Sequence, residues 1–149
     1  MHGNASIAEF AQLNLGNFVE RSGFVETNQR SLLMTHLSLP AATRSVATWG
    51  VCLCPPLSVE KQCSARSYVQ LARSLAASGI PCIRYDPTGC GDSTGVTSDI
   101  RLSGLVDEAL RAGALLRHTS RVTGIAYVGL LIGATVARLR SEEHTSELQ

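Results

Sequence analysis

The sequence predicts an α/β domain in which a β-hairpin precedes a βαβαβ unit, a parallel sheet with helices packed on its faces. Apolar, strand-like segments alternate with segments of helical periodicity, and each interval between strands is long enough for a helical crossover. Such crossovers are right-handed and place successive strands side by side. The length of 149 residues suits one domain of ordinary size, or a part of a larger one.

The N-terminal third predicts a hairpin and then a strand. Residues 1–22 are weakly patterned, and we expect a loose arm there. Residues 23–40, GFVETNQRSLLMTHLSLP, contain two runs rich in Val, Thr, Leu and Met around a polar Asn-Gln centre, which favours a hairpin. Residues 46–56, VATWGVCLCPP, predict an apolar strand that ends at the proline pair, because proline cannot donate to a central ladder.

The first helix is predicted over residues 64–78, with Gly79 where a C-terminal cap belongs. Its apolar side chains share one side at helical spacing: Val69, Leu71, Ala72, Leu75 and Ala76. Residues 80–86, IPCIRYD, then predict a strand that ends in the glycine-rich turn PTGCGDSTG.

The second helix carries the clearest periodicity in the chain. One apolar stripe joins Leu102, Leu105, Val106, Ala109, Leu110, Gly113 and Leu116. Asp107 and Arg111 stand at i,i+4 on the opposite, solvent side. Residues 122–129, VTGIAYVG, predict the strand that follows.

Composition excludes several classes of function. A net charge of +1 and scattered basic residues give no reason to expect a nucleic-acid partner. No segment approaches the roughly 20 apolar residues of a membrane span, and the N-terminus lacks the pattern of a secretory signal. An odd number of cysteines, five, with no C-x-x-C pair argues against disulfides and against a metal site, so we expect a reducing cytoplasm. Cys52 and Cys54, two apart on a strand, should share a face and pack as small apolar side chains.

The glycine-rich turn does not predict a cofactor. A dinucleotide fingerprint needs G-x-G-x-x-G, whereas the glycine after Gly89 and Gly91 comes one place too late. Asp92 would also repel phosphate, and no Gly-Lys-Ser of a P-loop is present. We interpret this segment as a structural turn, and a nucleotide-dependent enzyme is the weakest of the functions considered.

Residues 127–134, YVGLLIGA, have the frame of a nucleophile elbow, G-x-S-x-G, with one change. Gly129 and Gly133 stand four apart, after an apolar strand and before an apolar run that can begin a helix. The central position, where the elbow carries a serine, is Leu131.

Together these motifs resemble the first half of the α/β hydrolase fold, in the branch of serine aminopeptidase-like and lysophospholipase-like enzymes. The resemblance covers residues 46–139. The proline loop and the unusual elbow are also similar to a hydrolase-like subgroup associated with exosortase systems. In family order, the matching positions are Pro55 to Leu57, Leu71 to Gly79, Asp86, the turn residues Gly89, Gly91, Ser93 and Gly95, and the elbow.

The resemblance implies an oxyanion hole made by two backbone N–H groups. Pro55 and Pro56 have no N–H, so Leu57 is the first possible donor after its strand, and Ile132 is the second. Both could equally be ordinary backbone groups of a turn and a helix start. Acyl transfer also needs a nucleophile and a base, and Leu131 can serve as neither.

No other residue is a good substitute for the missing serine or its base. Thr135 is one turn into the next helix, and Cys90 lies in the glycine-rich turn, where a packed thiol is expected. The histidines His2, His36 and His118 do not match the position of the family's catalytic histidine.

The resemblance places the catalytic acid and histidine after the elbow, beyond this chain, and the C-terminus is unusual. Residues 140–149, RSEEHTSELQ, resemble a translated sequencing adapter. We therefore expect residues 23–139 to be the front part of the hydrolase-like domain, with a non-native tail. Glu142, Glu143, His144 and Glu147 would then carry no biological meaning.

Two functions follow from this sequence. The first is a fragment of a hydrolase-like protein, inactive as it stands, whose parent acts on an ester, acyl or peptide substrate. The second is a non-catalytic module that binds a small molecule or an acyl chain on the same fold.

Overall fold

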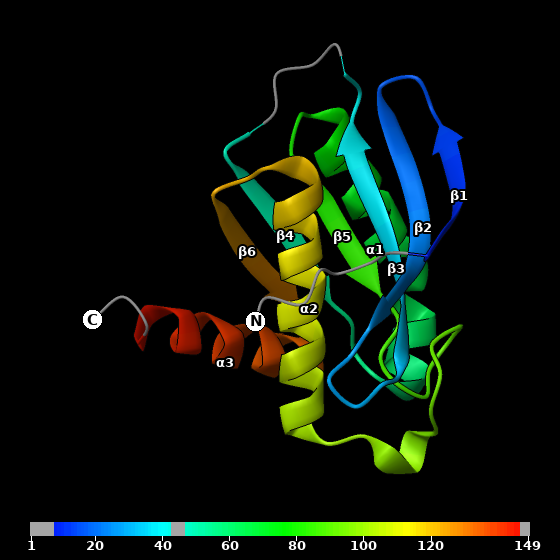
Figure 1. Cartoon of the computed structure of the whole chain (residues 1–149), viewed down its shortest axis with the longest axis vertical. Coiled ribbons are helices and arrows are strands. Elements are labelled where there is room, and N and C mark those ends of the chain that lie inside the picture. Colours follow the sequence, from blue (N-terminus) through cyan, green and yellow to red (C-terminus); the bar gives the residue numbers. More distant parts are fainter. Residues whose placement is uncertain (1–7, 43–46, 147–149) are drawn as a thin grey trace.

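The computed structural model describes residues 8–42 and 47–146. Helices cover both faces of one sheet (Figure 1). The strands are β1 (Ala8–Asn14), β2 (Phe18–Glu26), β3 (Leu32–Pro40), β4 (Trp49–Cys54), β5 (Cys82–Tyr85) and β6 (Gly124–Gly129). The helices are α1 (Ser58–Ala77), the 3₁₀ turn η1 (Thr97–Asp99), α2 (Leu102–Ser120) and α3 (Ile132–Ser146). His2, Val46 and Glu147 lie outside the described residues.

The strand order in the sheet is β1-β2-β3-β5-β4-β6. The ladders from β1 to β5 are antiparallel, whereas β5, β4 and β6 run parallel to one another. The predicted class, a hairpin followed by a βαβαβ parallel unit, is therefore confirmed. Parallel neighbours need a helical crossover, and α1 and α2 supply the two that link β4, β5 and β6.

The expectation of a loose arm over residues 1–22 is wrong from residue 8 onward. β1 and the first half of β2 occupy this stretch and pair as an antiparallel ladder. The described side chains of β1, residues 11–14, are all exposed, so the short alternation AQLN does not mark a buried face. Its order comes from backbone pairing with β2 and includes an irregularity between Glu9 and Ala11.

The hairpin predicted over residues 23–40 is confirmed. β2 and β3 pair in continuous register from Phe18↔Pro40 to Glu26↔Leu32. The connecting turn closes through Thr27, whose N–H donates to the Ser31 carbonyl at 2.8 Å. Arg30 takes a φ of 59° in this turn.

α1 begins six residues earlier than expected, at Ser58 instead of Ser64. The extra turns are polar and mostly exposed, so apolar periodicity could not reveal them. Its C-terminus is as predicted: Gly79 has a φ of 92°, and its N–H donates to the Ala76 carbonyl at 3.0 Å. The next N–H, of Ile80, donates to the Leu75 carbonyl at 2.9 Å, which completes a Schellman motif.

The central strands divide the core into two layers. Cys52 and Cys54 are fully buried in the cluster formed with α2 and α3, which confirms that they share a face and pack as apolar groups. The alternate residue Leu53 packs with Ala72 of α1 on the other face. In Figure 1, α1 accordingly lies behind the sheet and α2 in front of it.

The buried stripe of α2 is wider than predicted and slightly rotated. Leu102 and Leu110, expected in the core, are 44% and 37% exposed. Glu108, Ala112 and Leu115 are buried in addition. Ala112 and Leu115 are covered because α2 packs against α3 as well as against the sheet. Glu108 is buried elsewhere, beside the loop after β5, where it accepts from the Thr88 N–H.

α3 runs without a break from Ile132 to Ser146. Residues 140–146, which the sequence assigned to a non-native tail, are therefore helical. Arg138 donates from Nε to Glu142 Oε1 at 2.9 Å, an i,i+4 pair on the exposed surface. That residues 140–149 are non-native stays a prediction, because a segment can form a helix whatever its origin.

Candidate functional site

The segment from β6 to α3 has the strand–turn–helix form of a nucleophile elbow. β6 ends at Gly129, Leu130 and Leu131 make the turn, and α3 begins at Ile132. The turn is closed by the N–H of Gly133, which donates to the Leu130 carbonyl at 2.9 Å. Leu131 has a φ of 55°, in the left-handed region that residues other than glycine seldom occupy.

Both glycines of the frame are required by close approach of the main chain. A Cβ on Gly129 would lie 2.2 Å from the carbonyl carbon and oxygen of Gly133. A Cβ on Gly133 would lie 2.3 Å from the carbonyl oxygen of Cys54. The G-x-x-x-G spacing therefore allows α3 to begin directly against the ends of β6 and β4.

Leu131 occupies the corner of this turn and is 57% exposed. A left-handed conformation costs a non-glycine residue about 1–2 kcal/mol, so the surrounding backbone holds Leu131 in place against a local preference. The side chain has no lone pair or dissociable proton. The corner thus presents a hydrocarbon where acyl transfer needs an oxygen or sulfur nucleophile.

The two predicted oxyanion-hole positions follow neighbouring parallel strands. Leu57 comes after β4 as the N-cap of α1, with φ −109° and ψ 165°, and Ile132 is the first residue of α3 after β6. Both side chains are partly buried against the same core cluster. The fold therefore brings the two positions to the same end of the sheet, where the parallel strands β4 and β6 finish. An oxyanion role for their N–H groups stays a prediction.

The alternative nucleophiles do not stand at the corner of the elbow. Thr135 is exposed in the first turns of α3. Cys90 lies in the turn after β5, and burial raises the pKa of its thiol, so the reactive thiolate is disfavoured.

The two described histidine side chains are also remote from the elbow in the topology. His36 sits on β3, separated from β6 by β5 and β4, and its Nδ1 lies 2.9 Å from Ser22 Oγ. Desolvation lowers the pKa of His36. His118 is exposed near the C-terminus of α2. Neither histidine is positioned as a base for residue 131.

The glycine-rich turn after β5 is held by hydrogen bonds to its neighbours. Ser93 Oγ donates to the Asp86 carbonyl at 2.6 Å and accepts from the Met34 N–H at 2.8 Å. The Asp86 carboxylate accepts from the Asp92 N–H at 3.1 Å, and a Cβ on Gly91 would lie 2.2 Å from it. These contacts explain Asp86, Gly91 and Ser93 as structural residues of a turn.

Two side chains at the end of the sheet were missed by sequence reasoning. Lys61 Nζ lies 2.7 Å from Asp86 Oδ1, and Tyr68 donates from its hydroxyl to the Cys54 carbonyl at 2.9 Å. Both come from α1, and Lys61 lies in the turns that the sequence did not predict as helical. They line a cavity of about 90 Å³ beneath the proline loop, together with Arg84 and Asp86. Leu131 does not line this cavity.

Comparison with known structures identifies the architecture. A lidless α/β serine hydrolase from Xanthomonas campestris is 22% identical, with a TM-score of 0.68 over 83% of this chain and 56% of the other. Est1E from Butyrivibrio proteoclasticus, solved with ferulic acid, is 20% identical, with a TM-score of 0.65 over 83% and 48%. An α/β serine hydrolase homologue from Coxiella burnetii is 16% identical, with a TM-score of 0.64 over 82% and 57%.

These likenesses establish the fold. The chain has a partial α/β hydrolase fold and spans about half the length of the solved structures it matches. No family model matches the sequence, and no curated protein is significantly similar to it. Among residues 8–42 and 47–146, no helix has the length and apolar character needed to cross a membrane.

Proposed function

We propose that this chain is part of an α/β hydrolase-fold protein whose elbow does not form an acyl–enzyme intermediate. The main support for this proposal is Leu131, which occupies the strained corner of an otherwise intact elbow frame. The strain and the two glycines are features that normally serve to present a nucleophile. Here the same backbone presents a hydrocarbon side chain.

The parent protein would bind an ester, acyl or peptide compound, the substrate classes that the hydrolase resemblance implies. The relatives with this fold include one solved with ferulic acid and a methylesterase, which supports a small-molecule ligand. All five cysteines are free thiols, which is compatible with a reducing cytoplasm as its location.

A serine-directed fluorophosphonate probe tests the absence of an acyl nucleophile. We expect no covalent labelling of this chain, or of the longest reading frame that contains it, under conditions that label an active serine hydrolase completely. Peptide mapping that finds stoichiometric modification of any serine would overturn the proposal. A Leu131→Ser variant of the longer protein adds a second readout, because labelling of that variant alone would show that the frame lacks only its nucleophile.

A second candidate is a binding module for an acyl chain, and exposed apolar groups at the elbow favour it. Leu131 is 57%, Leu130 47% and Val128 45% exposed, so an apolar surface surrounds the corner. A fluorescent fatty acid should bind the chain, and Leu131→Asp should weaken binding at least tenfold. Val96→Asp is the matched control, since Val96 is 56% exposed in a loop. Equal binding by both variants would exclude the elbow as the binding surface.

A further inference from the structure

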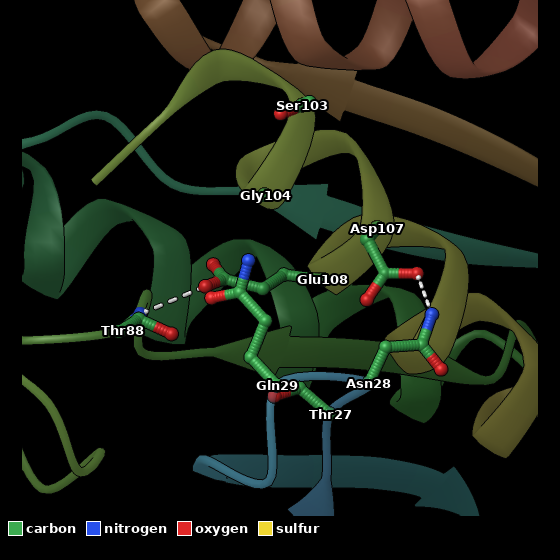
Figure 2. A pocket seen from close by; sticks show the side chains of 8 residues that line it. All are labelled: Thr27, Asn28, Gln29, Thr88, Ser103, Gly104, Asp107 and Glu108. Carbon is green, nitrogen blue, oxygen red and sulfur yellow. Dashed lines mark hydrogen bonds between the residues drawn. The ribbon is translucent and has the colours of Figure 1, made fainter. Parts of the chain in front are cut away.

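A second cavity, of about 230 Å³, lies between the β2–β3 turn and the first turns of α2 (Figure 2). Residues 27–29 of the turn form one wall, and Ser103, Asp107 and Glu108 form another. Thr88, from the loop after β5, closes the site. The cavity shares no lining residue with the elbow.

Glu108 is the notable group in this cavity. Its residue is only 4% exposed, and Oε1 accepts a hydrogen bond from the Thr88 N–H at 3.1 Å. Oε2 is buried without a hydrogen-bond partner among the described residues. Burial raises the pKa of Glu108, although hydrogen bonding from the side chain and the N–H of Thr88 opposes this effect. A buried acceptor that lacks a donor costs about 1–3 kcal/mol, so a ligand that donates to Oε2 would recover stability.

The ionisable side chains that line the cavity are acidic. Asp107 accepts from Asn28 Nδ2 at 2.8 Å, and Figure 2 shows this pair beside Glu108. Arg111 lies beside the cavity and contacts two of its lining residues: it donates to Asn28 Oδ1, and its Nε lies 3.9 Å from Asp107 Oδ1. The lining thus holds two carboxyl groups and no cationic side chain.

The donor set favours an organic cation over a metal ion. No group of three or more His, Cys, Asp or Glu side chains suited to a metal occurs within the described part of the chain. The remaining lining groups are hydroxyls and amides, which suit hydrogen bonds to a small polar molecule. A volume of about 230 Å³ is several times the roughly 30 Å³ that one water occupies in the liquid.

We propose that this cavity binds a small organic molecule carrying a primary ammonium group, which donates to Glu108 Oε2 and is attracted by Asp107. The hydroxyl and amide side chains of Thr27, Gln29 and Ser103 line the space for its short chain. This is a binding site, and it involves no bond-forming step.

Calorimetric titration of the chain with butylamine tests the assignment, with 1-butanol as the neutral analogue of the same shape. Butylamine should bind saturably and at least tenfold tighter than 1-butanol, and it should shift the NMR signal of the Thr88 N–H. Glu108→Gln should weaken butylamine binding at least tenfold. Asp99→Asn, an exposed carboxylate in η1 outside the lining, should leave it unchanged.

A blocking variant keeps the test decisive should Glu108→Gln not fold. Ser103 is exposed at the start of α2 and lines the cavity, so Ser103→Phe fills the space without touching the core. This variant should abolish binding. Equal affinities for butylamine and 1-butanol, no saturable binding of butylamine, or full binding by Ser103→Phe would each overturn the proposal.

Discussion

Gly133 packs so closely on the main chain of Cys54 that a Cβ built on the glycine would lie 2.3 Å from the Cys54 carbonyl oxygen. The Pro55 carbonyl oxygen would be 2.9 Å from the same atom. One residue of the elbow therefore fixes the approach of α3 to the end of β4. The second glycine of the elbow frame is therefore required by packing, independently of the chemistry of residue 131.

Gly133→Ala should consequently destabilise the chain by about 2–3 kcal/mol, because its neighbours on this side are backbone atoms that cannot rotate away. Gly104→Ala is the matched control: it lies in α2, and a Cβ there meets nothing within 4 Å. Alanine in place of this helical glycine should raise the free energy of unfolding by up to about 1 kcal/mol. Urea denaturation measures both, and equal effects of the two substitutions would contradict the close approach.

The positive φ of Leu131 predicts an unusual response to glycine. Leu131→Gly should leave the free energy of unfolding unchanged or raise it slightly, because relief of the left-handed strain offsets the entropy of glycine. Ala114→Gly, at an exposed position within α2, should lower it by about 1 kcal/mol. Equal losses for both variants would indicate that residue 131 is unstrained.

Glu20 links β2 to α1 and predicts a loss of stability in acid. It accepts from Arg73 Nε at 3.0 Å and from Arg73 Nη2 at 2.8 Å, and Arg84 Nη2 lies 3.6 Å from its Oε1. The hydrogen bond from Arg73 is the main cause of the lowered pKa of Glu20, and burial opposes it. Because the folded pKa lies below the unfolded one, this stabilisation is present above the unfolded pKa of 4.5 and disappears as pH falls through the folded value.

Glu20→Gln should therefore lower the free energy of unfolding at neutral pH by about 1–3 kcal/mol and reduce its further decrease toward about pH 3. Glu26→Gln, an exposed carboxylate at the end of the same strand, should behave as the parent. Denaturant titrations at the two pH values measure the effect. An unchanged acid-induced loss in Glu20→Gln would show that this ion pair does not set the pH dependence.

The outer edge of β6 predicts self-association. Within the described residues β6 pairs only with β4, and Val128 beside the open edge is 45% exposed. Unpaired backbone groups next to an apolar surface favour aggregation. The chain should sediment as oligomers or aggregates, and Val128→Lys should increase the monomer fraction, whereas Val96→Lys in a loop should not. A soluble monomer with a sharp, cooperative melt would contradict this prediction.

Local patterns predicted those elements whose signals lie within a few residues. The hairpin, the strand that ends at the proline pair, the Gly79 cap and the elbow frame all depend on short motifs, and the structure has each of them. The first turns of α1 carry mostly polar side chains, and the described side chains of β1 are all exposed, so apolar periodicity did not reveal either segment. Sequence patterns also did not predict the ion pair of Lys61 with Asp86, because the two residues come from separate segments of the chain.

The amino-acid sequence by itself determined the α/β class, the order of the elements and the absence of a nucleophile at residue 131. These features depend only on residue types and their spacing along short segments of the chain. Only the tertiary structure decided that Leu131 is held at a positive φ, that Gly133 contacts Cys54, and that Glu108 is buried with a carboxyl oxygen unpartnered. Those three facts arise where segments far apart in the chain pack together. The free energy of such contacts belongs to the assembled fold and to no single segment.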